Sequence, residues 1–216
     1  MIIIMTNGKS YSSRVTKMTV QAGEVGIKLN QSVVDAGRVD IVARIRSSDD
    51  LMALMLTVDA VRAEEPSVFV HLYRPYVPYA RQDRVTAEGE AVSIRVLARM
   101  INSCKFDTVT IVDPHSDVTP ALIDNVYVVD AYEVFKHTKQ WQNTWIVAPD
   151  AGATKRCEKF AKQVRAKGVI QCIKTRDPAT GALSGFKCLD DVAGKELAIV
   201  DDICDAGGTF LGLRAE

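Results

Sequence analysis

Residues 197–209 read LAIVDDICDAGGT, and they are the most informative stretch of this 216-residue chain. An apolar run typical of a buried parallel strand ends in two carboxylates, Asp201 and Asp202. A Gly-Gly-Thr sequence follows at 207–209, where bare backbone N–H groups and a hydroxyl at the start of a helix suit one phosphate group. Open α/β sheets bind ligands beyond the carboxyl ends of their strands. The stretch therefore predicts an α/β fold whose ligand carries hydroxyls and a phosphate, as a pentose phosphate does; the alternative is an ordinary turn capped by aspartate and glycine.

The rest of the chain alternates short apolar runs with segments of helical period, the pattern of β-α-β units around a mainly parallel sheet. The strands expected inside the chain are Val39–Ile45, Ser67–Leu72, Thr108–Val112, Trp145–Ala148, Val169–Ile173 and Leu197–Val200. Met1–Met5 is also expected to be a buried strand. Apolar residues at helical spacing predict three helices: one behind an N-cap cluster at 48–50, one behind Ser93, and one over 157–164 with Gly168 as its C-cap.

A polar stretch, Glu133–Asn143, has no strong period and separates two sets of strands and helices. It predicts two domains, residues 1–138 and 139–216.

Composition and charge exclude several classes of partner and of metal site. Lysine plus arginine and aspartate plus glutamate both total 27, so no overall basic field would attract nucleic acid or an anionic membrane. The longest apolar runs are too short to span a bilayer, and the N-terminus lacks the pattern of a signal peptide. Five cysteines without a C-x-x-C pair fit reduced thiols, and three scattered histidines offer no all-histidine metal site. We therefore expect a folded cytoplasmic protein with no nucleic-acid or membrane partner.

Polar side chains stand at several expected strand ends, and each has two interpretations. Arg81 and Gln82 can hold phosphate oxygens and a base edge, or can form a surface ion pair. His115 directly follows the strand expected at 108–112, which predicts that it lies at the same sheet edge as the acid pair at 201–202, and it is either structural or a ligand. Asp150 precedes a helix N-terminus and suits either a cap or a magnesium ion.

Two cations, Lys174 and Arg176, alternate just past another expected strand and lead into the sequence DPATG at 177–181, which is typical of a mobile loop. Cations on a loop that closes suit phosphoryl transfer, because catalysis there is mostly positioning and stabilisation of charge. The alternative is a solvated pair of loop charges.

Five segments together resemble the motifs of the ribose-phosphate pyrophosphokinases, the enzymes that make phosphoribosyl pyrophosphate (PRPP). They stand in the family's order: YARQDR at 79–84, DPHSD at 113–117, PDAGA at 149–153, KTRDP at 174–178 and the PRPP-type loop at 201–209. The similarity runs from about Gly23 to Thr209. It implies two phosphoribosyltransferase-like α/β domains with mainly parallel sheets flanked by helices, the second domain being incomplete. It also implies transfer of diphosphate from ATP to the anomeric hydroxyl of ribose 5-phosphate, giving PRPP and AMP.

The resemblance implies roles for individual residues. The matching catalytic pair is Lys174 and Arg176, and the matching ligands of the cofactor Mg²⁺ are His115 and Asp150. The implied ATP-binding residues are Glu24, Arg81, Gln82, Asp83 and His115. The implied ribose 5-phosphate-binding residues are Asp201, Asp202, Asp205, Ala206, Gly207, Gly208 and Thr209. The implied partners are ATP, ribose 5-phosphate and further copies of the chain, as a homo-oligomer.

The chain departs from the family pattern at three places. Residues 20–24 read VQAGE where the family has Phe-x-Asp-Gly-Glu. Only the last two residues of that adenine-binding segment, the glycine and the glutamate, are retained. Residues 85–90 read VTAEGE in place of a basic stretch, which predicts weak control by ADP. Ala206 stands where the phosphate loop usually has threonine.

Two other functions remain as alternatives. A type I phosphoribosyltransferase shares the loop at 201–209 but does not need the segment at 79–84 together with His115 and the cations at 174 and 176. A non-catalytic subunit that regulates an active partner would keep the fold, but it would not need those two cations.

Overall fold

The computed structural model describes residues 1–7, 12–176, 183–204 and 206–215. The chain forms two compact units, unit 1 over Met1–Val129 and unit 2 over Asp130–Glu216. Both are mainly parallel sheets flanked by helices, which confirms the predicted fold class. The predicted boundary between residues 138 and 139 lies further along the chain than this division and stays a prediction.

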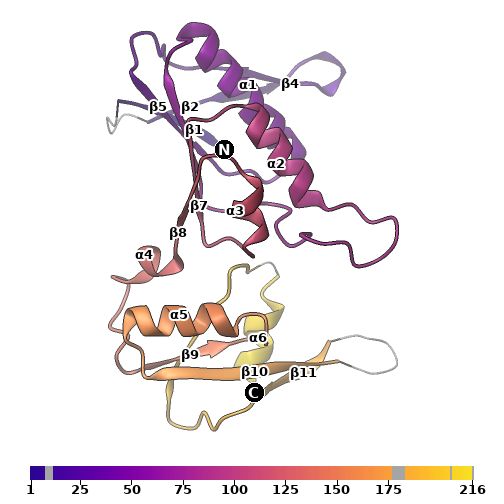
Figure 1. Ribbon diagram of the computed structural model, residues 1–216, viewed down its shortest axis with the longest axis vertical. Helices are drawn as coiled ribbons and strands as arrows, with labels where there is room; N and C mark the ends of the chain where they lie inside the picture. Colours follow the sequence, from indigo (N-terminus) through magenta and orange to yellow (C-terminus); the bar gives the residue numbers. More distant parts are fainter. Residues whose placement is uncertain (8–11, 177–182, 205, 216) are drawn as a thin grey trace. The chain divides into compact units, whose positions relative to one another are not determined.

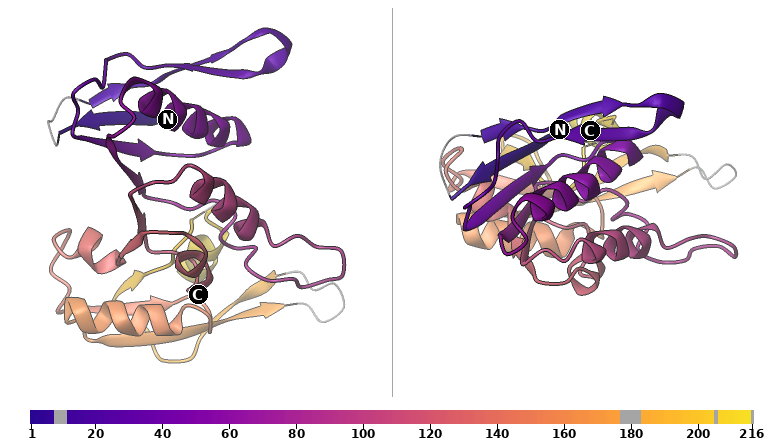
Figure 2. Two further views of the ribbon diagram at one scale, coloured as in Figure 1. Left: turned by 45° about the horizontal axis from the view of Figure 1, so that its top comes forward. Right: turned by 90° about the horizontal axis from the view of Figure 1, so that it is seen from above.

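Unit 1 contains a six-stranded sheet in the order β2-β1-β5-β6-β7-β8, a separate ribbon of β3 and β4, and three α-helices among its described residues. The bounds are β1 Ile2–Thr6, β2 Ser12–Arg14, β3 Thr16–Thr19, a 3₁₀ turn at Gln21–Gly23, β4 Val25–Lys28, β5 Arg38–Ala43, α1 Ser48–Glu64, β6 Phe69–Arg74, α2 Ser93–Ser103, β7 Thr108–Val112, α3 Val118–Leu122 and β8 Val126–Val129. Figure 2 shows the β3–β4 ribbon, in indigo, projecting from this unit.

Strands β5 to β8 are parallel and lie side by side in chain order. Right-handed crossovers between such strands place every connecting helix on the same face of the sheet, and Figure 1 shows α1, α2 and α3 together on one side. The residues that face these helices are almost fully buried, for example Ile41, Leu72 and Ile111 at 0 % exposure. The predicted strand at the N-terminus is confirmed, since Ile2 and Ile4 of β1 belong to the same core.

Helix α1 begins one residue earlier than its predicted cap cluster implies. The N-cap is Ser47, whose hydroxyl accepts a hydrogen bond from the backbone N–H of Asp50 at 3.2 Å. Asp49 and Asp50 therefore lie in the first helical turn, where negative charge favours the positive end of the helix dipole. Along the described ranges, none of the helices combines the length and apolarity needed to cross a lipid bilayer.

Unit 2 contains a four-stranded sheet in the order β11-β10-β9-β12, in which β9, β10 and β12 are parallel and β11 is antiparallel to β10. The bounds are α4 Ala131–Phe135, β9 Thr144–Ala148, α5 Thr154–Val164, β10 Gly168–Arg176, β11 Leu183–Cys188, β12 Glu196–Ile199 and α6 Gly208–Ala215.

Side chains of β9 alternate between two cores, one on each face of the unit 2 sheet. Ile146 and Ala148 pack in a cluster with α5, whereas Val147 packs on the other face with Phe186 of β11 and Leu213 of α6. The sheet is thus covered by α5 on one face and α6 on the other.

The prediction that Gly168 caps α5 is wrong. The C-cap is Arg165, which adopts the left-handed conformation with φ 57°. Gly168 instead begins β10, where a Cβ atom would lie 2.7 Å from Cζ3 of the Trp145 ring. A glycine is needed at that position because the indole ring occupies the space that a side chain would take, not because a helix ends there.

Candidate active site

Three predicted segments of unit 2 meet at one edge of its sheet. Strands β10, β9 and β12 are parallel neighbours, so their carboxyl ends lie together. Asp150 follows β9, Lys174 lies in β10 beyond the last residue paired with β9, and Asp201 and Asp202 follow β12. The order of these motifs along the chain does not show which strands are neighbours, whereas the strand order in the sheet does.

Asp150 and Lys174 form an ion pair. The Lys174 ammonium donates to Oδ2 of Asp150 at 2.5 Å, and Oδ1 of Asp150 accepts from the backbone N–H of Ala153 at 3.1 Å. Burial raises the pKa of the Asp150 carboxyl, but the hydrogen bond and positive charge of Lys174 outweigh that effect, so the pKa is lowered. Asp150 therefore holds the turn before α5 with one oxygen and the Lys174 ammonium with the other, and its role as a magnesium ligand stays a prediction.

The paired carboxylates at the end of β12 are held in place by an arginine. Arg156 on α5 donates from Nη1 to Oδ1 of Asp202 at 2.5 Å, and the same nitrogen lies 4.0 Å from Asp201. Oδ1 of Asp201 accepts the backbone N–H of Asp202 at 3.0 Å. Burial first, and then the hydrogen bond and charge of Asp202 and the charge of Asp150, raise the pKa of Asp201. This edge of the sheet therefore concentrates negative charge that hydroxyl donors or a cation would relieve.

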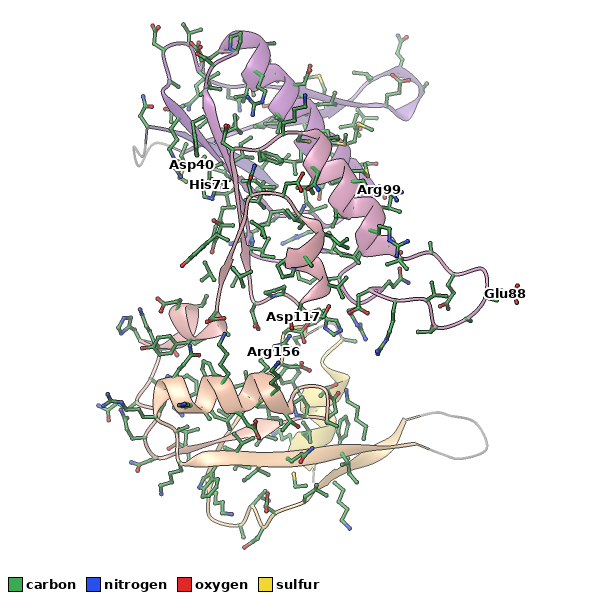
Figure 3. The ribbon with its side chains drawn as sticks, in the orientation of Figure 1. Asp40, His71, Glu88, Arg99, Asp117 and Arg156 are labelled. Atoms are coloured by element: carbon green, nitrogen blue, oxygen red, sulfur yellow. The ribbon has the colours of Figure 1, made fainter. Side chains whose placement is uncertain are left out.

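Sequence reasoning missed Arg156, although a signal was present. Lys155 and Arg156 stand in the first turn of α5, which contains no acidic residue. Positive charge at a helix N-terminus is unfavourable unless an anion lies nearby. In Figure 3, Arg156 projects from the end of α5 that adjoins these carboxylates.

The loop predicted to bind phosphate leads directly into α6. Gly207 has φ 77°, a conformation that favours glycine, and α6 begins at Gly208 with Thr209 in its first turn. A Cβ atom at Gly207 or Gly208 would meet no atom within 4 Å, so the backbone here is open to a ligand. Ala206 precedes this turn, and Asp205 lies outside the described residues.

In unit 1 the loop between β6 and α2 is tied to the end of β7. Asp83 accepts a hydrogen bond from Oγ of Ser116 at 2.7 Å, which brings it to the residue next to His115. Gln82 accepts through Oε1 from the hydroxyl of Ser93, at the start of α2. Arg81 is exposed beside them. The structure thus gathers the Arg81–Asp83 segment and His115 at one sheet edge, while Glu88, labelled in Figure 3, lies at the outer end of the loop.

The two remaining predicted site residues are Glu24, which lies apart from the others, and Arg176. Glu24 lies in the exposed turn between β3 and β4, in the ribbon that projects from unit 1, and its carbonyl accepts the N–H of Val20 at 2.9 Å. Arg176 is the last residue of β10 and pairs with Leu183 of β11, just after an irregularity in the strand register. The expected mobile loop at 177–181 lies outside the described residues.

The proposed magnesium ligands belong to different units, His115 to unit 1 and Asp150 to unit 2. The prediction that His115 lies at the same sheet edge as the acid pair is wrong, because β7 and β12 belong to different sheets. Within the described part of the chain, no three His, Cys, Asp or Glu side chains are grouped to hold a metal ion. Mg²⁺ typically takes one or two carboxylates and fills its remaining positions with water and substrate phosphates. The Asp150 carboxylate and the negative charge around Asp201, both in unit 2, fit such an ion.

Comparisons with known proteins agree with these motifs. Residues 4–104 match the family described as the N-terminal domain of ribose phosphate pyrophosphokinase. The chain is 32% identical over 171 residues to a ribose-phosphate pyrophosphokinase of Cereibacter sphaeroides, covering 76% of this chain and 50% of the relative. It is 28% identical over 200 residues to one of Aquifex aeolicus, covering 89% of this chain and 63% of the relative. The chain therefore spans between half and two thirds of the length of these relatives.

A solved structure gives the same result. The phosphoribosylpyrophosphate synthetase of Mycobacterium smegmatis superposes with a TM-score of 0.74 at 25% sequence identity, covering 93% of this chain and 66% of that one. The fold therefore matches across both units. The chain is related to the ribose-phosphate pyrophosphokinases, and the resemblance carried by its sequence motifs is confirmed.

Proposed function

We propose that the protein transfers the diphosphoryl group of ATP to the anomeric hydroxyl of ribose 5-phosphate, producing PRPP and AMP. The observation that carries this proposal is the meeting of Asp150, Lys174 and the Asp201–Asp202 pair at one sheet edge, next to the glycine turn that starts α6. The order of motifs and the named relatives support the same reaction.

The acceptor sugar binds at the end of β12. The carboxylates of Asp201 and Asp202 accept hydrogen bonds from ribose hydroxyls, and Arg156 orients the Asp202 carboxylate at that edge. The backbone N–H groups at Gly207, Gly208 and Thr209 hold the 5-phosphate at the N-terminus of α6. Asp205 and Ala206 complete this loop in the proposal.

The donor nucleotide binds through the other set of motifs. Arg81, Gln82 and Asp83 contact ATP together with His115, and Glu24 contributes from the ribbon of another copy in a homo-oligomer. Bound Mg²⁺ supplies positive charge that neutralises the phosphate oxygens, and Asp150 and His115 are the residues that hold it. Lys174 and Arg176 stabilise the charge on the transferring group.

The decisive experiment is to measure AMP release from ATP and ribose 5-phosphate with Mg²⁺, with no nucleobase added. Lys174→Ala should lower kcat roughly a hundredfold to a thousandfold while KM for both substrates stays within a few-fold, because charge on the diphosphoryl group is redistributed only in the transition state.

Lys162→Ala on α5 is the matched control, since Lys162 is an exposed lysine of the same unit, and it should behave as the wild type. No AMP release from ATP and ribose 5-phosphate, together with diphosphate release from PRPP and a nucleobase, would favour a phosphoribosyltransferase instead. Unchanged kcat in Lys174→Ala would refute the catalytic assignment of Lys174, and no turnover of either substrate pair by the wild type would favour a non-catalytic subunit.

A further inference from the structure

Two cysteines face each other across the hairpin that carries Lys174. Cys172 of β10 and Cys188 of β11 are directly paired in the antiparallel ladder, and their Sγ atoms are 2.7 Å apart. None of the five cysteines, all of which lie among the described residues, is in a disulfide. The two thiols are therefore adjacent in the folded protein.

The hydrogen-bond pattern of the ladder shows whether Cys172 and Cys188 are a hydrogen-bonded or a non-hydrogen-bonded pair. The N–H of Leu189 donates to the carbonyl of Gln171 at 2.9 Å, so residues 171 and 189 form a hydrogen-bonded pair. Hydrogen-bonded and non-hydrogen-bonded pairs alternate along an antiparallel ladder, so Cys172 and Cys188 form a non-hydrogen-bonded pair, with Cα atoms about 4.5 Å apart. Disulfides span Cα separations of about 4.4–6.8 Å. The backbone thus needs little or no movement to accommodate a disulfide.

The two thiols differ in access. Cys172 is 0 % exposed and packs with Ile170, Val147 and Phe186, whereas Cys188 is only partly buried at the edge of the same cluster. A small oxidant in solution therefore reaches Cys188 first, and Cys172 lies where it can react next.

We propose that Cys172 and Cys188 are a thiol modification site, which a low-molecular-weight disulfide such as oxidised glutathione converts to a reversible cross-strand disulfide. The Cys188 thiol loses its proton to solvent, and its thiolate attacks one sulfur of the oxidant, forming a mixed disulfide and releasing one thiol. Cys172, also deprotonated, then attacks Sγ of Cys188, the mixed disulfide breaks, and a second small thiol leaves. Two protein thiols lose two electrons, and one small disulfide becomes two thiols.

The position of this site gives the disulfide a structural effect. Lys174 is two residues beyond Cys172 on the same face of β10, opposite Phe186, and Phe186 packs against Gly212 of α6. A covalent link at 172 and 188 holds β10 to β11 directly beside the strand position of Lys174. It therefore restricts local opening of the hairpin, independently of which reaction the protein catalyses.

The test is to incubate the whole protein with reduced or oxidised glutathione, block remaining thiols by alkylation, and analyse tryptic peptides by mass spectrometry. Cleavage at the basic residues of the sequence gives GVIQCIK (168–174) and CLDDVAGK (188–195) as separate peptides. In the oxidised sample we expect these two peptides joined by a disulfide, and in the sample reduced again with dithiothreitol we expect each one alkylated.

A second readout is amide hydrogen exchange of β10 and β11, which should slow at least about tenfold in the oxidised protein, because closing a loop in the opened state disfavours opening. The control variant Cys204→Ser removes an exposed thiol and should leave both results unchanged, whereas Cys188→Ser should abolish both. Glutathione retained on Cys188 with no linked peptide, or intermolecular linkage through Cys204, would overturn the proposal.

Discussion

Arg38 and Arg74 belong to neighbouring strands of unit 1, but among the described residues only Arg38 has an acidic partner. Arg38 donates from Nε and Nη2 to Oδ1 of Asp40, at 2.9 and 2.6 Å. Arg74 is 1 % exposed, and its Nε and Nη1 have no hydrogen-bond partner among the described residues. Its remaining nitrogen makes a long 3.4 Å contact to the carbonyl of Tyr76. Burial lowers the pKa of Arg74 to about 10, which shows how unfavourable its charge is there.

Replacing Arg74 with an apolar side chain of similar length should therefore stabilise unit 1. We expect Arg74→Met to raise the free energy of unfolding by about 1–4 kcal/mol, the range seen when buried ion pairs are replaced by well-packed apolar groups. Urea denaturation would measure it. Arg99→Met on the exposed face of α2, where Figure 3 labels Arg99, is the matched control and should change stability little. A loss of stability in Arg74→Met would mean that the guanidinium is satisfied in solution.

The Asp40 carboxylate has a further partner besides Arg38, and these contacts predict that the stability of unit 1 decreases in acid. Its Oδ1 also lies 2.8 Å from Nδ1 of His71, whose Nε2 lies 2.9 Å from Oγ1 of Thr110. Burial raises the pKa of Asp40, but the hydrogen bonds and charges of Arg38 and His71 lower it further than burial raises it. A carboxylate whose pKa is lowered by folding stabilises the protein above its ordinary pKa, and that stability disappears as the pH falls through the lowered value.

Asp40→Asn should accordingly be less stable than the wild type at pH 7, by about 1–2 kcal/mol, since it removes a hydrogen bond acceptor shared by two partly buried groups. The difference should shrink as the pH falls from about 4 towards 2. Urea midpoints measured across this range test the prediction. A gap between variant and wild type that stays constant with pH would contradict it.

At the scale of secondary structure, apolar periodicity predicted the elements that form the cores. The strand expected at 108–112 matches β7, and the others differ from the observed strands by a few residues at their ends. Most of the elements that were missed lack such a pattern, although β8, which reads VYVV, has one and was also missed. Strand β3 reads TKMT and is exposed along its whole length, α3 and α4 span only five residues each, and β11 has a glycine at its centre. Those segments are held by neighbours in space, which local sequence does not encode.

For the candidate site too, local sequence predicts only local features. Motifs at strand ends could be found from the sequence, because each is local. The contacts Asp83–Ser116 and Arg156–Asp202 could not, because they join residues far apart in the chain.

Helix α6 approaches its sheet through a glycine, and this contact can be tested. A Cβ atom on Gly212 would lie 2.2 Å from Cε2 of the Phe186 ring, so alanine there must displace the ring or the helix. We expect Gly212→Ala to destabilise unit 2 by about 1–3 kcal/mol, because overpacking exceeds the roughly 1 kcal/mol that alanine gains over glycine in a helix.

Thermal unfolding measures the change. Gly208→Ala, in the same helix but at a position where a Cβ atom would meet nothing within 4 Å, should be neutral or slightly stabilising. The double variant Gly212→Ala with Phe186→Leu should recover part of the loss if the ring is the obstacle. Equal effects of the two single glycine variants would remove the packing explanation.

At the scale of the whole molecule, each unit has its own buried core. Leu97 of α2, 2 % exposed, belongs to the core of unit 1, and Ile146 of β9, 0 % exposed, belongs to a core of unit 2. Units with separate cores are expected to open independently.

Leu97→Ala should therefore lower the stability of unit 1 by about 2–5 kcal/mol through a cavity, and speed amide exchange in β5 to β8 without changing it in β9. Ile146→Ala should give the reverse pattern. Hydrogen exchange followed by mass spectrometry distinguishes the two. If either substitution sped exchange equally in both units, the chain would unfold as one cooperative body.

The alternation of side chains along β10 also limits which insertions and deletions this strand can accept. Cys172 and Lys174 share the face that packs with α6, and the residue between them points to the face covered by α5. Inserting or deleting one residue before Lys174 would turn the lysine towards α5 and away from Asp150, whereas a change of two residues would keep it on its side. Natural or engineered length variation in this strand is therefore expected to occur in even steps, and a single-residue change should persist only where a β-bulge restores the alternation.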